Sequence, residues 1–179
     1  MLENDTVKLR ALEPDDVNLL YLWENDPDVW LVGERVEPYS KFDIERYILS
    51  EGDIFANRQL RLMIERKHDG VAIGAVDLFD FNPLHRRAGI GLLIYQPENR
   101  GRGYAGEALK IIVNYAFSLL NIHVLYCNVS ANNISSLHCM KKAGFTECGV
   151  KKEWNITPSG RVDEIMLQLI CGNEKMQKM

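Results

Sequence analysis

The sequence predicts a mixed α/β fold, in which a mostly antiparallel sheet carries helices on both faces. Short apolar or alternating segments are typical of strands, and longer segments with apolar residues three and four positions apart are typical of helices. The two kinds are interleaved along the chain. The 179 residues, 46% of them hydrophobic, suffice for one sizeable core. We expect a single domain over residues 1–171 and a short polar tail at 172–179.

The N-terminal part is predicted to hold one strand and two helices. Val7–Arg10 alternates in hydropathy, as a half-buried strand does. The helix that follows is predicted to end at Pro27, because proline cannot continue it. Ser40 and Asp43 resemble a capping box, which predicts that a second helix begins there and extends to about Leu49.

The remaining chain alternates between strands and helices. We expect strands at 60–65, 71–79, 87–95, 124–129, 145–155 and 162–170, and helices at 104–120 and 134–143. His68-Asp69-Gly70 predicts a hairpin between the first two of these strands. The strand at 87–95 is mostly apolar and is therefore predicted to be central. Gly144 is a residue that commonly ends a helix.

Composition excludes several classes of function. The formal net charge of −4 and the sequence pI of about 5.6 argue against a nucleic-acid partner, which usually needs a basic face. No apolar run reaches the roughly 18 residues of a membrane span, so no membrane partner is expected. The N-terminus lacks signal-peptide features, and the four cysteines form no C-x-x-C pair. We therefore expect a cytoplasmic protein with reduced thiols and no metal site.

The loop Arg100-Gly101-Arg102-Gly103-Tyr104-Ala105 is the strongest functional signal. It lies between the predicted central strand and a long helix. Glycines let the backbone approach a ligand, and the first amides of a helix have no partner within the helix. The arginines add positive charge. This arrangement favours a phosphate-bearing ligand.

Two common phosphate motifs do not fit this loop. A Walker loop requires Gly-Lys-Ser/Thr, whereas this chain continues Gly103-Tyr104-Ala105. The glycines at 101, 103 and 106 do have the spacing of a dinucleotide fingerprint. However, the loop follows an antiparallel hairpin, and residues 121–128 contain no acid to bind a ribose.

Together with its neighbours, the loop resembles the GCN5-related N-acetyltransferase (GNAT) family over nearly the whole chain. The matching residues are Leu93-Ile94-Tyr95-x-Pro97, Arg100 with Gly103 and Ala105, Asn133 with Ser136, and Gly144-Phe145. His85-Arg86-Arg87-Ala88 is similar to the branch that contains spermidine and ribosomal-protein alanine acetyltransferases. Glu37-Pro38-Tyr39 and the segment 81–88 look more like the spermidine enzymes.

The resemblance implies transfer of acetyl from acetyl-CoA to a primary amine, by direct attack in a ternary complex. The expected cofactor-binding residues are Leu93, Ile94, Tyr95, Arg100, Gly101, Arg102, Gly103, Tyr104, Ala105, Gly106, Asn133 and Ser136. Amides of 100–106 would hold the pyrophosphate, and amides around 93–95 would face the thioester carbonyl. A bulge would separate the central strand from its neighbour. Asn133 also fits a helix N-cap.

Met140 occupies the position where many relatives carry a tyrosine acid. Methionine has no proton to give, so plain core packing is the preferred interpretation and the general acid is not identified. Asp77 and Asp80 are candidates for deprotonating the amine through water, and Asp80 is expected just past the strand end. Gly89 is a second departure, because similar enzymes often carry a glutamate there.

The acceptor is expected to contact Glu34, Glu37 and His85. Ordinary solvated carboxylates and a solvated strand entry remain the alternatives for these residues. Three functional hypotheses stand: acetylation of a polyamine such as spermidine, acetylation of a protein N-terminus, and a non-catalytic acyl-CoA-binding module. A homo-oligomer is expected only by analogy with the family.

Overall fold

The structure is a computed structural model, and it describes residues 2–33, 37–50 and 52–172. The strands are β1 (Val7–Arg10), β2 (Leu60–Arg66), β3 (Ala72–Asn82), β4 (Arg87–Ile94), β5 (Val124–Ser130), β6 (Thr146–Thr157) and β7 (Gly160–Ile170). The α-helices are α1 (Val17–Glu24), α2 (Pro27–Gly33), α3 (Lys41–Ser50), α4 (Ile54–Asn57), α5 (Tyr104–Ser118) and α6 (Ile134–Lys142). Two short 3-10 helices, η1 (Pro14–Asp16) and η2 (Pro97–Asn99), precede α1 and α5.

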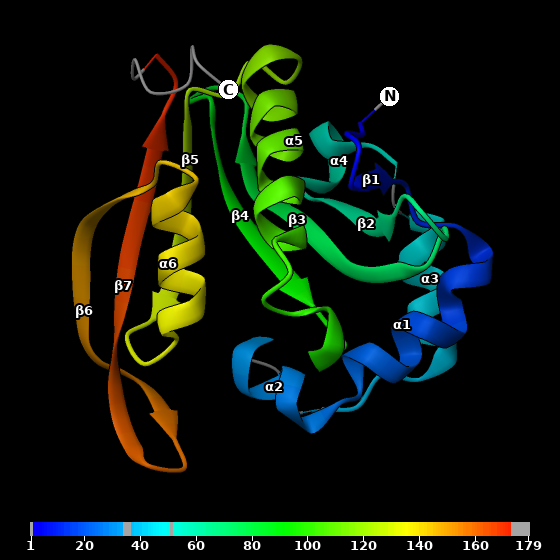
Figure 1. The fold of residues 1–179 in the computed structure, drawn as a ribbon, viewed down its shortest axis with the longest axis horizontal. Helices are drawn as coiled ribbons and strands as arrows, with labels where there is room; N and C mark the ends of the chain where they lie inside the picture. Colours follow the sequence, from blue (N-terminus) through cyan, green and yellow to red (C-terminus); the bar gives the residue numbers. More distant parts are fainter. Residues whose placement is uncertain (1, 34–36, 51, 173–179) are drawn as a thin grey trace.

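The seven strands form one sheet in the order β1-β2-β3-β4-β5-β7-β6 (Figure 1). Every neighbouring pair is antiparallel except β4 and β5, which are parallel. The crossover between these two strands contains α5, as parallel neighbours require a long connection. The predicted mixed, mostly antiparallel sheet is confirmed.

The sheet has apolar packing on both faces. One core cluster joins the sheet to α5 and α6, and Ile94 of β4 belongs to it. A second cluster joins the sheet to α1 and α3, and the adjacent Tyr95 belongs to that one. Because successive side chains of a strand point to opposite faces, the two helix layers cover opposite sides of the sheet. Figure 1 shows α5 and α6 together, well separated from α1 and α3.

The N-terminal helical segment is more divided than the sequence predicted. The first helix ends at Glu24, and Pro27 begins α2 instead of only ending its predecessor. This fits the preference of proline for a first helical turn. The capping box is confirmed: the Asp43 amide donates to Ser40 Oγ at 3.1 Å, and the Ser40 amide donates to Asp43 Oδ2 at 3.2 Å. The short helix α4 was not predicted.

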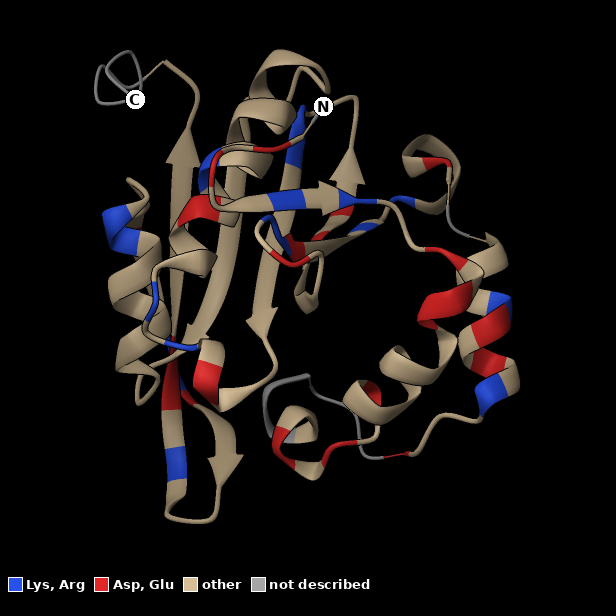
Figure 2. Cartoon of the chain, turned by 45° about the vertical axis from the view of Figure 1, so that its right-hand side comes forward, with Lys and Arg blue, Asp and Glu red and all other residues tan. Residues whose placement is uncertain are grey.

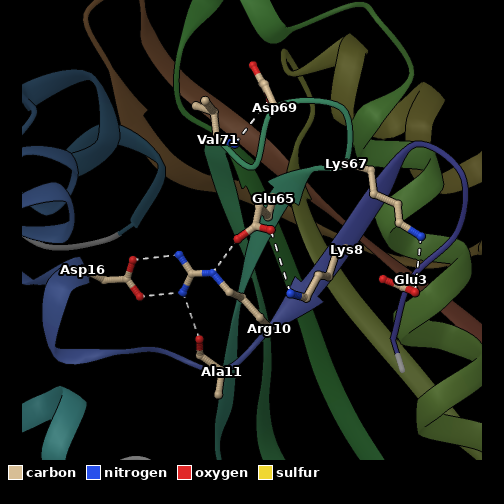
Figure 3. Close-up of polar contacts among 9 residues, drawn as sticks. All are labelled: Glu3, Lys8, Arg10, Ala11, Asp16, Glu65, Lys67, Asp69 and Val71. Atoms are coloured by element: carbon tan, nitrogen blue, oxygen red, sulfur yellow. Dashed lines mark hydrogen bonds and ion pairs between the residues drawn. The ribbon is translucent and has the colours of Figure 1, made fainter.

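Arg10 fastens this helical segment to the edge of the sheet (Figure 3). Its guanidinium donates to both oxygens of Asp16 at 2.7 and 2.9 Å and to Glu65 Oε2 at 2.8 Å. Asp16 also accepts from the Glu13 amide at 2.8 Å. One arginine on β1 therefore joins β2 to the turn that starts α1.

No helix in the described ranges is both long and apolar enough to cross a membrane.

Candidate active site

The parallel pair β4–β5 separates after three residues. Arg87, Ala88 and Gly89 pair with residues 124–126, and no later residue of β4 has a partner on β5. The separation of the central strand from its neighbour is therefore present, as expected. The bulge lies elsewhere than expected: the register shifts between Phe79 and Asn82 of β3, whereas β4 keeps regular pairing from residue 89 to residue 94.

The separation leaves particular amides of β4 without a strand partner. The Tyr95 amide donates to Ile73 O at 3.0 Å. Because the amides of a strand alternate in direction, Leu93 also points toward β3, and Leu92 and Ile94 point toward the open edge. This corrects the expectation for Tyr95 and Leu93. Leu92 and Ile94 offer the amides that could stabilise an oxyanion.

The glycine loop leaves the first amides of α5 available to bind an anion. Gly101 and Gly103 have φ values of 71° and 87°, in the left-handed region that favours glycine. No side chain caps the helix, and its first hydrogen bond runs from the Glu107 amide to Gly103 O at 3.1 Å. The amides of residues 104–106 therefore have no partner within the helix and point outward. These residues fit a pyrophosphate.

Arg100 has a different role from the one expected. Its amide donates to Pro97 O at 3.0 Å, so this amide is not offered to a ligand. Its guanidinium donates to Ile94 O at 2.9 Å and Tyr95 O at 2.7 Å. The side chain therefore ties the loop back to the end of β4. Arg102 is exposed within the loop and remains a candidate for phosphate contact.

Two predicted positions on α6 have clear structural roles. Asn133 is the N-cap of α6, and its side chain accepts from the Ser136 amide at 3.1 Å. Met140 is 7% exposed and belongs to the larger core cluster, as the packing interpretation expected. A cofactor role for Asn133 and Ser136 remains a prediction.

A cavity of about 290 Å³ lies on the α1 and α3 side of the sheet. Its lining residues are Glu24, Val29, Trp30, Tyr39, Arg61, Ala75, Asp77, Gly91, Leu92, Leu93 and Tyr95. Positions 91–93 lie in the part of β4 that no longer pairs with β5. The cavity therefore reaches the open edge of β4, where a thioester facing the Leu92 and Ile94 amides would lie.

Arg61 links the two carboxylates of this cavity. Its Nε and Nη2 donate to Asp77 Oδ1 and Oδ2 at 2.6 and 3.2 Å, and its Nη1 donates to Glu24 Oε1 at 2.5 Å. Burial alone would lower the pKa of Arg61, but Asp77 and Glu24 outweigh burial and hold that pKa well above its usual value. With one cation and two carboxylates, the cluster carries an excess charge of −1.

Tyr95 connects β4 to the helical wall of the cavity. Its ring stacks on Trp23 of α1, with centroids 4.0 Å apart, and its hydroxyl donates to Glu24 Oε1 at 3.4 Å. Burial, with the Glu24 carboxylate as a second cause, raises the pKa of Tyr95 above its usual value. The phenol therefore stays protonated at neutral pH.

Asp80 lies apart from this cavity. It belongs to β3, which continues to Asn82, so the expectation that it leaves the strand was wrong. It adopts φ 49° beside the bulge, and its Oδ2 accepts from the Tyr126 hydroxyl at 2.9 Å. Burial and this contact with Asp80 raise the pKa of Tyr126 to about 12. Asp77 and Asp80 thus face different surroundings.

The described acceptor candidates His85 and Glu37 do not line the cavity. His85 is exposed in the turn between β3 and β4, where its amide donates to Asn82 Oδ1 at 2.9 Å. Glu37 is exposed beside Tyr39. Glu34 lies outside the described residues. The cavity instead brings in Glu24 and Arg61, which the sequence did not single out.

Phe79 explains the structural setting of Gly89. A Cβ atom at residue 89 would overlap the Phe79 ring. The same ring makes an edge contact with Tyr126, with centroids 5.9 Å apart. An aromatic side chain from β3 thus fills the space beside the β4 backbone at this position. No side chain larger than hydrogen fits there without rearrangement.

Comparison with known sequences decides the family. The profile described as "Acetyltransferase (GNAT) domain" matches residues 6–146. The chain belongs to the GNAT family. It is an acetyl-CoA-dependent N-acetyltransferase, and the acetyl-CoA expected from the sequence is the acetyl donor of this family.

Several similar GNAT proteins are spermidine acetyltransferases. The chain is 32% identical over 146 residues to a spermidine N(1)-acetyltransferase of Vibrio cholerae, covering 82% of each chain. It is 34% identical over 141 residues to the Escherichia coli (strain K12) protein of that name, covering 79% of this chain and 73% of the other. The Vibrio cholerae spermidine N-acetyltransferase in complex with CoA and spermine superposes with a TM-score of 0.81 at 27% identity, over 93% and 96% of the two chains.

The cavity residue Arg61 could have been found from the sequence. Arg61 and Asp77 each lie eight residues from Asp69, the centre of the predicted hairpin, and they are indeed cross-strand partners. An arginine opposite an aspartate in two otherwise apolar strands indicates a buried ion pair. Glu24 gave no comparable signal, because its place depends on how α1 packs on the sheet.

Proposed function

We propose that this GNAT enzyme acetylates a primary amine of a polyamine such as spermidine. The observation that supports this acceptor most directly is the cavity at the open edge of β4, with its excess negative charge from Glu24 and Asp77. Negative charge in a partly buried site favours a cationic ligand. The similarity to spermidine N(1)-acetyltransferases supports the same acceptor class.

The acetyl donor would bind across the sheet from the cavity. Amides of residues 104–106 would hold its pyrophosphate, helped by the positive end of the α5 dipole. The pantetheine arm would lie along the edge of β4 that β5 leaves free. In this arrangement the Leu92 and Ile94 amides face the thioester oxygen. Acetyl-CoA supplies an activated acyl group whose thiolate is a tolerable leaving group.

Direct attack by the amine requires that it first loses a proton. Asp77 lies in the cavity, so a water bound to this carboxylate could take that proton. The nitrogen then attacks the carbonyl carbon, and the two β4 amides stabilise the oxyanion, each by a few kcal/mol. Collapse of this oxyanion breaks the C–S bond and releases the thiolate, while the nitrogen gives up its extra proton to water. Because Met140 cannot donate a proton, water is the proposed proton source for the thiolate.

An amine panel tests this function. The enzyme and acetyl-CoA are combined with spermidine, spermine, simple diamines, a monoamine and peptides with N-terminal Ala or Ser, and thiol release is measured. We expect release with the polyamines at micromolar to millimolar KM. Turnover with the peptides alone would refute the polyamine acceptor in favour of a protein N-terminus.

We also propose that the enzyme self-associates. A spermidine N-acetyltransferase from Vibrio cholerae described as dodecameric superposes with a TM-score of 0.76 at 27% identity. Light scattering coupled to size exclusion gives the mass directly. A monomer at 20.5 kDa at micromolar concentration would refute self-association.

A further inference from the structure

The two carboxylates of the cavity differ in how many of their oxygens accept hydrogen bonds from the protein. Both oxygens of Asp77 accept from Arg61. Oε1 of Glu24 accepts from Arg61 and from the Tyr95 hydroxyl. Among the described residues, none donates to Oε2 of Glu24. Oε2 of Glu24 is therefore the one carboxylate oxygen of this cluster that accepts no hydrogen bond from the described residues.

The charge on Glu24 is held in place. Arg61 stays protonated, since its two carboxylate partners hold its pKa well above the usual value. It fixes Glu24 through a hydrogen bond of 2.5 Å, and the Glu24 side chain is only 16% exposed. A carboxylate in this position keeps little rotational freedom, so a ligand that binds it loses little further entropy.

The surroundings of Glu24 suit an alkylammonium ion. Trp30 and Tyr39 line the same cavity, and the Trp30 indole donates to Glu24 O at 2.7 Å, which fixes this ring beside the end of α1. Aromatic rings attract ammonium groups and pack against methylenes. Gly91, Leu92 and Leu93, from the edge of β4 that β5 leaves free, line the same cavity. One ligand in it can therefore meet both Glu24 and this edge.

We propose that Glu24 binds the non-reacting ammonium of the acceptor through Oε2 and thereby makes this enzyme prefer diamines to monoamines, with Arg61 as its positioning residue. This inference rests on the proposed function, because it assumes that the acceptor amine enters this cavity. Asp77, both of whose oxygens already accept from Arg61, contributes to the charge of the site, and the discrimination between the two kinds of amine is assigned to Glu24.

Matched acceptors test the inference without any variant. Putrescine and n-butylamine share a four-carbon chain, and a second pair consists of the eight-carbon diamine and n-octylamine. For at least one pair we expect a kcat/KM for the diamine that exceeds the monoamine value by about 10- to 100-fold, as one charge-assisted contact would give. Equal kcat/KM values within both pairs would overturn the role of Glu24 and leave amine acetylation intact.

Glu24→Gln removes the charge and keeps the shape. We expect it to reduce the diamine-to-monoamine ratio to within about threefold of unity, mainly through the KM of the diamine, with KM for acetyl-CoA unchanged. Glu24→Asp keeps the charge on a shorter side chain and should restore part of the preference. Asp28→Asn on α2 removes an exposed charge next to the lining residue Val29, and it should retain the native ratio.

The outcomes separate the two proposals. A native preference that survives Glu24→Gln overturns the assignment of Glu24. A loss of preference in Asp28→Asn as well would attribute it to the general field of the acidic helices in Figure 2 and would also overturn the assignment. Failure of every amine to release thiol refutes the proposed function itself. If Glu24→Gln does not fold, the matched acceptor pairs can still overturn the assignment, because equal kcat/KM values within both pairs exclude it.

Discussion

The donor side and the acceptor side of this site are built in different ways. The proposed donor side consists of the consecutive backbone amides of residues 104–106 and of alternate amides on β4. The proposed acceptor side consists of side chains from five separate helices and strands, among them Glu24, Arg61 and Asp77. Backbone sites depend on glycine spacing and helix position, which are local in sequence. Side-chain sites depend on packing, so the acceptor can change while the donor stays the same.

Gly103→Glu should have the largest effect and should act on the donor side alone. Residue 103 adopts φ 87°, and a carboxylate there would face the pyrophosphate. We expect KM for acetyl-CoA to rise by about 100-fold or more, since the site would lose a phosphate-binding surface and gain a repelling charge. Steady-state kinetics at saturating amine measure this change.

Gly160→Glu is the matched control for this variant. Residue 160 also has a positive φ, 116°, and lies at the tip of the β6–β7 hairpin with open space around it. It should suffer the same backbone strain without loss of donor binding. An unchanged acetyl-CoA KM in Gly103→Glu would show that the pyrophosphate lies elsewhere.

Gly89→Ala tests the packing of the Phe79 ring on β4, the strand that borders both the donor side and the acceptor side. The added methyl group would overlap the Phe79 ring, and we expect a loss of about 1–3 kcal/mol in unfolding free energy. Gly91→Ala is the control, because its Cβ would lie 3.8 Å from Phe79, an ordinary contact. Denaturant unfolding gives both values. Equal stability of the two variants would contradict the packing of Phe79 on β4.

Asp16→Asn tests whether the anchor behind α1 serves the acceptor side. It removes the charge that Arg10 binds, and a loss of about 1–2 kcal/mol is expected. Because α1 carries Glu24, the amine KM should rise more than the acetyl-CoA KM. Asp15→Asn, at an exposed neighbouring carboxylate, should change neither. Equal effects on both KM values would contradict the idea that α1 serves the acceptor side more than the donor side.

The stability that the Asp16 carboxylate contributes should also depend on pH. Burial tends to raise the pKa of Asp16, but the bonds from Arg10 and the Glu13 amide outweigh burial and lower it. A group with a lower pKa in the folded state stabilises the protein above its unfolded value, near 3.8, and this stabilisation disappears as the pH falls through the folded value. The difference in Tm between native enzyme and Asp16→Asn should therefore be present at pH 7 and shrink below pH 4.

Met140→Leu should have the smallest effect. Leucine and methionine have similar volumes, so we expect less than about 1.5 kcal/mol of destabilisation and a kcat within about twofold of native. Thermal unfolding and amine turnover measure the two quantities. A large fall in kcat with unchanged Tm would show that the Met140 side chain takes part in the reaction, against its interpretation as core.

The parts that the sequence predicted are those controlled by local chemistry. The glycines at 101 and 103, the Ser40–Asp43 box and the hairpin at 68–70 each specify a backbone conformation within a few residues. The separation of the central strand from its neighbour followed from the family resemblance and is confirmed. The order of the strands in the sheet was not predicted.

The errors concern what neighbouring elements do to a residue. The directions of the Tyr95 and Leu93 amides depend on which residues of β4 pair with β3, and a one-residue change reverses the choice. Arg100 was assigned to phosphate because its charge is local, whereas its position lets it reach the carbonyls that end β4. Glu24 joined the site only through the packing of α1.

The two hydrogen bonds from Arg100 to Ile94 O and Tyr95 O also fix the distance between the loop and the end of β4. They hold the loop that we propose to bind the pyrophosphate at a fixed distance from β4, whose amides would face the thioester. An acyl donor must therefore have the right length between its pyrophosphate and its thioester to reach the loop and the β4 amides at the same time. A donor shortened at its phosphate end should lose alignment of its carbonyl as well as affinity, so that its kcat falls together with its binding.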